Sequence, residues 1–151
     1  MGTVRNGDED QKTAAAAALR ALACHPDNKP EIVRLGGLAP LVTLALAGND
    51  AQKEVAAAAL GNLATDHDAN KGAVVRAGGL VPLLEMMSRG TEAQKEAAAC
   101  TLRSLAHARE NKAAIASAGG VLALAKLARG GSAWQREHAM AALYALSSDL
   151  A

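Results

Sequence analysis

Three lysines recur at one position of this 151-residue chain and are its first candidates for chemistry. Lys29, Lys71 and Lys112 each follow an asparagine, and nearly equal lengths of chain separate them. Ammonium groups repeated in this way could contact the carboxylates of an acidic partner segment. The alternative is three solvated lysines in the first turn of a helix, where the helix dipole slightly disfavours positive charge.

Trp134 and His138 are the second candidate pair, because both are large side chains that could anchor a partner. Residues four apart lie on the same face of a helix. An exposed tryptophan is a typical binding hot spot. In the alternative, Trp134 packs over the end of its own repeat.

Residues typical of metal sites and of enzymes do not form a recognisable pattern. Cys24 and Cys100 belong to no C-x₂-C or H-x₃₋₅-H spacing with the four histidines. Motifs for phosphate loops, dinucleotide-binding turns, serine hydrolases and zinc peptidases are missing from the sequence. We therefore expect no metal, no cofactor and no catalysis, and we expect two free thiols in a reducing compartment.

A further set of acids recurs in phase: Glu54, Glu96 and Glu137. Each stands beside a base, for example Glu54 beside Lys53 and Glu96 beside Lys95. We interpret these glutamates as surface residues, or as residues that pair within their own helix.

Composition excludes several classes of partner. The 16 Lys and Arg nearly balance the 15 Asp and Glu, which argues against nucleic acid, since its binders normally carry a basic excess. The polar segment from Met1 to Lys12 resembles no secretory signal, and no apolar run is long enough to cross a membrane. The expected location is the cytoplasm or the nucleus. Half of the residues are hydrophobic, yet Phe is missing, so the core must consist of Leu, Val, Ile and Ala.

These candidates are positioned by a repeat, with a period of about 41 residues, that runs through the chain and whose size indicates a solenoid. A Gly-Gly pair, a Leu-x-x-Leu pair and a single Gln mark it. The glycine pairs stand at 36–37, 78–79 and 119–120, the leucine pairs begin at 19, 60, 102 and 143, and the glutamines are Gln11, Gln52, Gln94 and Gln135. In a solenoid each unit buries its apolar face against its neighbours.

Each unit is predicted to contain three helices. The first helices (28–35, 70–77 and 111–118) begin at an asparagine N-cap and end at the glycine pair. The second helices are 38–47, 80–89 and 121–129. The third helices each open with a capping box, at residues 8–11, 49–52, 91–94 and 132–135. The predicted division is a partial repeat, 1–27, which supplies only a third helix, followed by complete repeats 28–69, 70–110 and 111–151.

Two strings carry a resemblance to a known family. Residues 28–42 (NKPEIVRLGGLAPLV) and 52–64 (QKEVAAAALGNLA) resemble armadillo repeats. The resemblance implies an all-α, right-handed α-solenoid. It also implies that the third helices line a concave groove that binds extended peptides or other proteins without catalysis.

Binding residues carry over from the family one position at a time. Members that bind nuclear-localisation signals resemble one another in a Trp followed four residues later by an Asn. Asn62 matches that Asn and is expected to bond a ligand backbone, although a solvent-facing role is the alternative. Ala58 stands where the Trp would be, so import-signal binding is not expected. Ser104 occupies the Asn position in the next unit.

Catenin-like members of the family offer a second correspondence. They resemble one another in a lysine, directly after the first-helix cap, that meets acidic ligand residues. Lys29, Lys71 and Lys112 match that position. An acidic peptide or protein segment is therefore the expected partner.

The sequence thus predicts a non-catalytic protein-interaction module. Its groove is expected to be open and shallow because small residues line it: Ala17, Ala21, Ala58, Ala97 and Ala141. The expected contacts are Lys29, Lys71, Lys112, Asn62, Ser104, Trp134 and His138. The alternative is a structural spacer within a longer array, or a segment that associates with itself through its exposed ends.

Overall fold

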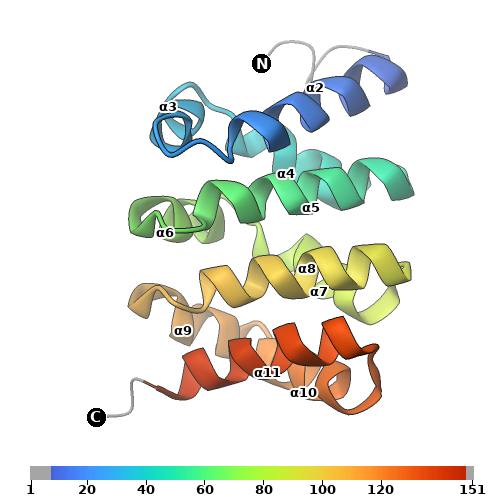
Figure 1. Ribbon diagram of the computed structural model, residues 1–151, viewed down its shortest axis with the longest axis vertical. Coiled ribbons are helices and arrows are strands. Elements are labelled where there is room, and N and C mark those ends of the chain that lie inside the picture. The colour runs from blue at the N-terminus through green and yellow to red at the C-terminus, as the bar shows by residue number, and fades with distance from the viewer. Residues whose placement is uncertain (1–7, 149–151) are drawn as a thin grey trace.

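The computed structural model describes residues 8–148, which form ten α-helices and no strand. The long third helices are α2 (Glu9–Leu22), α5 (Asp50–Ala64), α8 (Glu92–Leu105) and α11 (Ala133–Ser147). The shorter helices are α3 (Asn28–Arg34) and α4 (Leu38–Ala47), α6 (Asp68–Arg76) and α7 (Leu80–Arg89), and α9 (Arg109–Ser117) and α10 (Gly120–Gly130). Figure 1 shows the long helices stacked from α2 to α11, with the shorter ones beside and behind them. The predicted all-α solenoid is confirmed.

The predicted repeat boundaries lie at or near the beginnings of the first helices. The boundary at 28 falls on the first residue of α3, while those at 70 and 111 fall just inside α6 and α9. The division itself stays a prediction. Residues 1–7 and 149–151 of the outer repeats lie outside the described range.

All four predicted capping boxes are present. The cap side chain of Asp8, Asn49, Thr91 or Ser132 accepts from the backbone N–H of the glutamine three residues later. Each glutamine side chain in turn accepts from the backbone N–H of the cap residue. These reciprocal bonds fix where every long helix begins.

The glycine pairs end the first helices as predicted. Gly36, Gly78 and Gly119 have φ of 86°, 91° and 88°, the left-handed conformation that glycine adopts without strain. After α3, the N–H of Gly36 donates to Val33 and that of Gly37 to Ile32, the bonding of a Schellman motif. The corner therefore turns the chain into the second helix.

The prediction that asparagines cap the first helices is wrong. Asn70 and Asn111 lie inside α6 and α9, and their side chains are buried. The Asn70 amide donates to the carbonyls of Lys29 and Leu63, each at 2.9 Å. Asn111 donates in the same way to Lys71 and Leu105. Asn28 is the first residue of α3, and Asp27 before it makes no side-chain cap bond. Asn70 and Asn111 instead connect their helices to the first helix of the preceding repeat and to the preceding long helix.

The glutamines of the capping boxes also tie neighbouring repeats. The Gln52 side-chain amide donates to the Glu9 carbonyl at 3.2 Å, and Gln94 donates to the Asp50 carbonyl at 3.0 Å. Gln135 donates to the Glu92 carbonyl at 3.3 Å. Each glutamine therefore stabilises the start of its own helix and holds the helix of the preceding repeat.

The core lies between the long helices and the shorter helices packed against them, and it consists mainly of leucine and alanine. Isoleucine and valine contribute as composition predicted, and Met86 and Met87 are buried in addition. Leu60, Leu63, Leu102 and Leu105 are fully buried. Their counterpart Leu22, on the first helix of the stack, is 52% exposed. Burial is therefore complete in the middle of the stack and incomplete at its described ends.

Within residues 8–148, no single helix is long and apolar enough to cross a membrane. The pairs α3–α4 and α9–α10 reach that length only together, and they are bent by 82° and 83°.

Candidate partner-binding groove

The long helices α2, α5 and α8 enclose a hollow of about 620 Å³ on one side of the stack. Alanines that the sequence placed in the groove line it, namely Ala17, Ala21, Ala58 and Ala97. Ala141 is not among its lining residues. Because alanine projects only a methyl group, the polar atoms around the hollow remain accessible.

Asn62 lines this hollow and is half-buried. Its amide nitrogen donates to the carbonyl of Arg20 at 3.0 Å and lies 3.4 Å from the Cys24 sulfur. Within residues 8–148 its amide oxygen makes no hydrogen bond. Asn62 therefore ties α5 to α2 and keeps one acceptor for a ligand.

Ser104 also lines the hollow and is half-buried. Its hydroxyl lies 3.3 Å from that of Thr65, which itself donates to the Gly61 carbonyl at 2.7 Å. Ser104 therefore donates to Thr65, and its lone pairs can still accept a hydrogen bond.

The three repeated lysines, Lys29, Lys71 and Lys112, differ in how far they are buried. Lys29 is 7% exposed, and its ammonium donates to the Thr65 carbonyl at 2.6 Å. Lys71 is 8% exposed and bonds Asp68 at 3.2 Å. Lys112 is half-buried, with its ammonium 3.5 Å from the Ser148 hydroxyl. Lys29 and Lys71 are thus not solvated, and they leave little surface for a partner.

Trp134 and His138 stack, with ring centroids 5.9 Å apart and an interplanar angle of 25°. Trp134 is 60% exposed and so does not pack closely over its own repeat. His138 is half-buried, and its Nδ1 accepts from the Arg103 guanidinium at 3.3 Å. Burial, and next the charge of Arg103, lower the pKa of His138 below its ordinary 6.5. The imidazole is therefore neutral at pH 7.

A second hollow of about 280 Å³ lies beside the first and extends to α11. Arg20, Glu54, Glu96, Cys100 and His138 line it, together with alanines. Neither Glu54 nor Glu96 was expected from the sequence to be a site residue. The available signal was their phase, which places one glutamate per repeat on the same helix face.

The interpretation that these glutamates pair within their helices is not supported. Lys95 pairs with Glu92 at 3.7 Å, not with Glu96. Within residues 8–148, no ion pair shorter than 4.0 Å involves Glu54 or Glu96. Both carboxylates therefore remain available to an incoming cation.

The two cysteines are free thiols that line the first hollow. Burial raises the pKa of the Cys100 thiol, and the charge of Arg103 partly offsets this. Within the described range, no group of three or more His, Cys, Asp or Glu could hold a metal ion.

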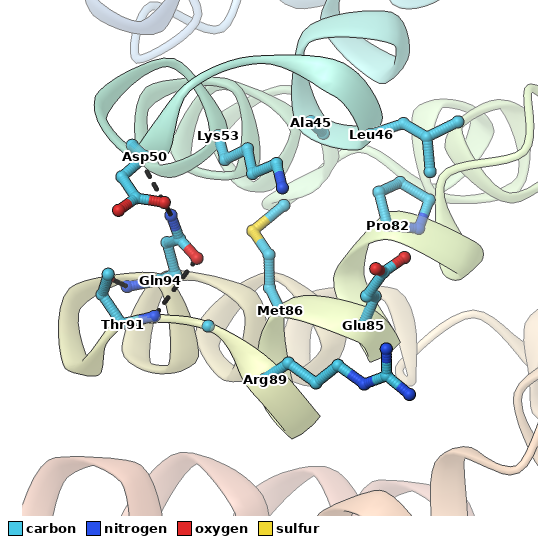
Figure 2. Close-up of a pocket in the computed structure, with 11 residues that line it drawn as sticks. Ala45, Leu46, Asp50, Lys53, Pro82, Glu85, Met86, Arg89, Thr91 and Gln94 are labelled. Atoms are coloured by element: carbon cyan, nitrogen blue, oxygen red, sulfur yellow. Dashed lines mark hydrogen bonds between the residues drawn. The ribbon is translucent and has the colours of Figure 1, made fainter.

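A third hollow, of about 260 Å³, lies at the edge of the stack, where α4 and α5 meet α7 and α8. Figure 2 shows Lys53 and Met86 pointing toward one another, and Asp50, Thr91 and Gln94 joined by hydrogen bonds. A similar hollow recurs one repeat later around Glu92, Lys95 and Gln135. These edge hollows are therefore spaces left by repeat stacking, with several of their polar groups already bonded.

Comparison with known proteins identifies the fold. Residues 25–65 match the family model of the armadillo/beta-catenin-like repeat. An engineered protein of known crystal structure is 30% identical, with a TM-score of 0.91 over 97% of this chain and 60% of its own. No curated protein matches this sequence.

Two designed proteins have the same fold. A crystal structure of computationally designed armadillo repeat proteins for modular peptide recognition is 26% identical, with a TM-score of 0.89 over 95% of this chain and 61% of that one. A designed armadillo repeat protein in complex with the peptide (KR)4 is 24% identical, with a TM-score of 0.90 over 96% and 62%. This chain therefore spans about three fifths of the length of these proteins.

Proposed function

Because this chain is an armadillo-repeat solenoid, we propose that it is a non-catalytic module that binds a peptide or protein segment along its long helices. The observation that carries the proposal is the hollow of about 620 Å³, which extends over α2, α5 and α8. A segment laid across these helices would contact three successive repeats.

The chemistry of the hollow suits a polypeptide backbone. The free amide oxygen of Asn62 can accept from a backbone N–H, and Arg20 can donate to a backbone carbonyl. The alanine floor leaves room for ligand side chains. The likeness to armadillo proteins designed for modular peptide recognition supports the same function.

The three repeated lysines bear on whether the partner segment is acidic. An acidic segment was expected from the lysine series, and a contact through Lys112 stays compatible with the structure. Support from Lys29 and Lys71 is weak, because both are buried and their ammonium groups are bonded. We also propose a cytoplasmic or nuclear location, because two free thiols persist best in a reducing compartment.

Charged substitutions of Ala58 test the proposal. A peptide ligand is first selected from a random peptide library against the wild-type protein. Its affinity is then measured by fluorescence anisotropy for Ala58→Glu and Ala58→Lys, with the same changes at exposed Ala113 on α9 as controls. Both Ala58 variants should bind at least about tenfold more weakly, equivalent to roughly 1.4 kcal/mol.

The glutamate and lysine variants carry opposite charges, so an electrostatic effect would weaken binding by one and strengthen binding by the other. Steric blockage of the hollow would weaken binding by both. Circular dichroism establishes that each variant is folded. Equal affinity for the wild type and both Ala58 variants, or failure of the library to yield any ligand, would contradict a groove function.

A second candidate is self-association through the ends of the stack, the alternative that the sequence left open. The observation favouring it is the surface of α11, where Met140 is 61% and Tyr144 76% exposed. The residue equivalent to Met140 in the preceding repeat, Ala99, is fully buried. Light scattering over a concentration series tests this candidate, and a monomer at the highest concentration would exclude it.

A further inference from the structure

We infer that the second hollow, which lies beside α11, selects the partner by taking a lysine or arginine side chain of the bound segment. The inference rests on the proposed function and names the chemistry of its ligand. It assigns the selective contact to Glu54, Glu96 and Trp134. These residues lie toward the beginnings of the long helices, before the Ala58 and Asn62 positions to which the family resemblance pointed.

The charge balance of this hollow favours a cation. Glu54 and Glu96 come from adjacent long helices and line the same space, and no described residue forms an ion pair with either. Among the described residues, Arg20 is the one cation that lines it, because His138 is neutral at pH 7. Two carboxylates therefore face one guanidinium, and a ligand cation would restore neutrality.

Nearby basic groups do not offer an equivalent site for an acid. The Arg103 guanidinium is bonded to His138, and it lines a different hollow. A ligand carboxylate that approached Arg20 would lie in the field of Glu54 and Glu96. Repulsion between like charges disfavours that arrangement, which counts against an acidic segment here.

Trp134 supplies an aromatic surface next to this hollow. Its ring stacks on His138, which is itself a lining residue, and 60% of Trp134 is exposed. A cation over an exposed indole is attracted by the negative face of the ring. The aliphatic stem of a lysine or arginine can lie on the methyl groups of Ala93 and Ala97 while its charged end meets the glutamates.

The experiment compares three labelled peptides of equal length, in which Gly and Ser alternate with Lys and Arg, with Asp and Glu, or with Gln. Affinity is measured by anisotropy at about 0.1 M ionic strength, where charges interact over roughly 10 Å. Emission from Trp134, the one tryptophan, is followed in parallel. The basic peptide should bind most tightly and should alone shift that emission.

Variants locate the contact. Glu54→Gln combined with Glu96→Gln should weaken binding of the basic peptide at least about fivefold, and Trp134→Leu about threefold, as expected for charge and cation–π contacts. The matched control is Glu85→Gln, which removes one exposed carboxylate on α7, outside this hollow, and should change affinity less than about twofold.

Tighter binding of the acidic peptide, or unchanged binding of the basic peptide by the double glutamine variant, overturns the inference. If the neutral or acidic peptide binds and the Ala58 variants abolish that binding, the groove function stands and only the cation site fails. If none of the three binds and the library yields no ligand, both fail.

Discussion

At the scale of single residues, Gly61 and Thr101 depend on one another across neighbouring repeats. Thr101 donates its hydroxyl to the Ala57 carbonyl at 2.8 Å, and a Cβ placed on Gly61 would lie 2.6 Å from that hydroxyl. Two repeats carry Arg20 and Arg103 at the position of Gly61. The glycine therefore accommodates the threonine.

Gly61→Ala should consequently destabilise the protein, and Thr101→Ala should remove most of the loss. The clash costs about 1–3 kcal/mol, offset in part by the roughly 1 kcal/mol that alanine gains over glycine in a helix. Urea unfolding of the two single variants and the double variant measures the coupling. Additive effects would show that the two sites are independent.

His138 predicts a pH dependence. Because its pKa is lowered in the folded state, the unfolded chain binds the proton more readily. Its contribution to stability is therefore present above pH 6.5 and is lost as pH falls below 6.5 through the folded pKa. The urea midpoint of the wild type should fall more between pH 7.5 and pH 5.5 than that of His138→Gln. Parallel curves would contradict this, and His107→Gln, at an exposed position, is the control.

At the scale of helices, each boxed glutamine has two separable functions. Its side-chain oxygen completes the capping box, and its nitrogen bonds the preceding repeat. Gln94→Glu retains the oxygen but removes the nitrogen donor and places a carboxylate beside Asp50, whose side chain now accepts at 3.1 Å. Gln11 forms the same box without a described bond to another repeat.

Gln94→Glu should therefore lower the free energy of unfolding by about 2–3 kcal/mol, since a lost bond adds to repulsion between carboxylates. Gln11→Glu should change it by less than about 0.5 kcal/mol. Chemical denaturation at pH 7 measures both. Equal losses would mean that the capping box, not the contact between repeats, governs stability here.

The features that the sequence predicted best are the beginnings and ends of the helices. Capping boxes and glycine corners depend on residues only a few positions apart, so both could be recognised locally. The side-chain amide of Asn70 instead bonds the carbonyl of Lys29, and the ammonium of Lys29 bonds that of Thr65, each across a whole repeat or nearly so. No local pattern distinguishes such an asparagine from an N-cap, or such a lysine from a solvated one.

The candidate groove likewise contains some residues that the sequence indicated and others that only the packing of neighbouring helices reveals. Family resemblance indicated Asn62 and Ser104, and the structure places both on one hollow. Glu54 and Glu96 were interpreted from the sequence as surface residues or as residues that pair within their own helix, because each stands beside a lysine. Only the position of the adjacent helix shows that they face a shared space. Their binding roles, like those of the lysines, stay predictions.

At the scale of the whole molecule, stability should vary along the stack. Leu63 and Leu105 on α5 and α8 are fully buried, whereas Leu22 on α2 is 52% exposed. In a solenoid each repeat is stabilised only by its neighbours, so helices with one neighbour open more readily. Hydrogen–deuterium exchange should be slowest in α5 and α8 and faster in α2 and α11. Uniform exchange along the chain would indicate a single cooperative unit.

Several hydrogen bonds between repeats share one property. The glutamine and asparagine side chains that make them each donate to a main-chain carbonyl of the preceding repeat. Gln52, Gln94 and Gln135 bond the carbonyls of Glu9, Asp50 and Glu92, and Asn70 and Asn111 bond those of Lys29 and Lys71. Every residue type offers that acceptor, so the main-chain half of each contact survives a change of side chain. Only the additional bonds from the glutamines to the carboxylates of Glu9, Asp50 and Glu92 depend on residue type. Gene duplication could lengthen such a stack, and later drift could retune what each copy recognises.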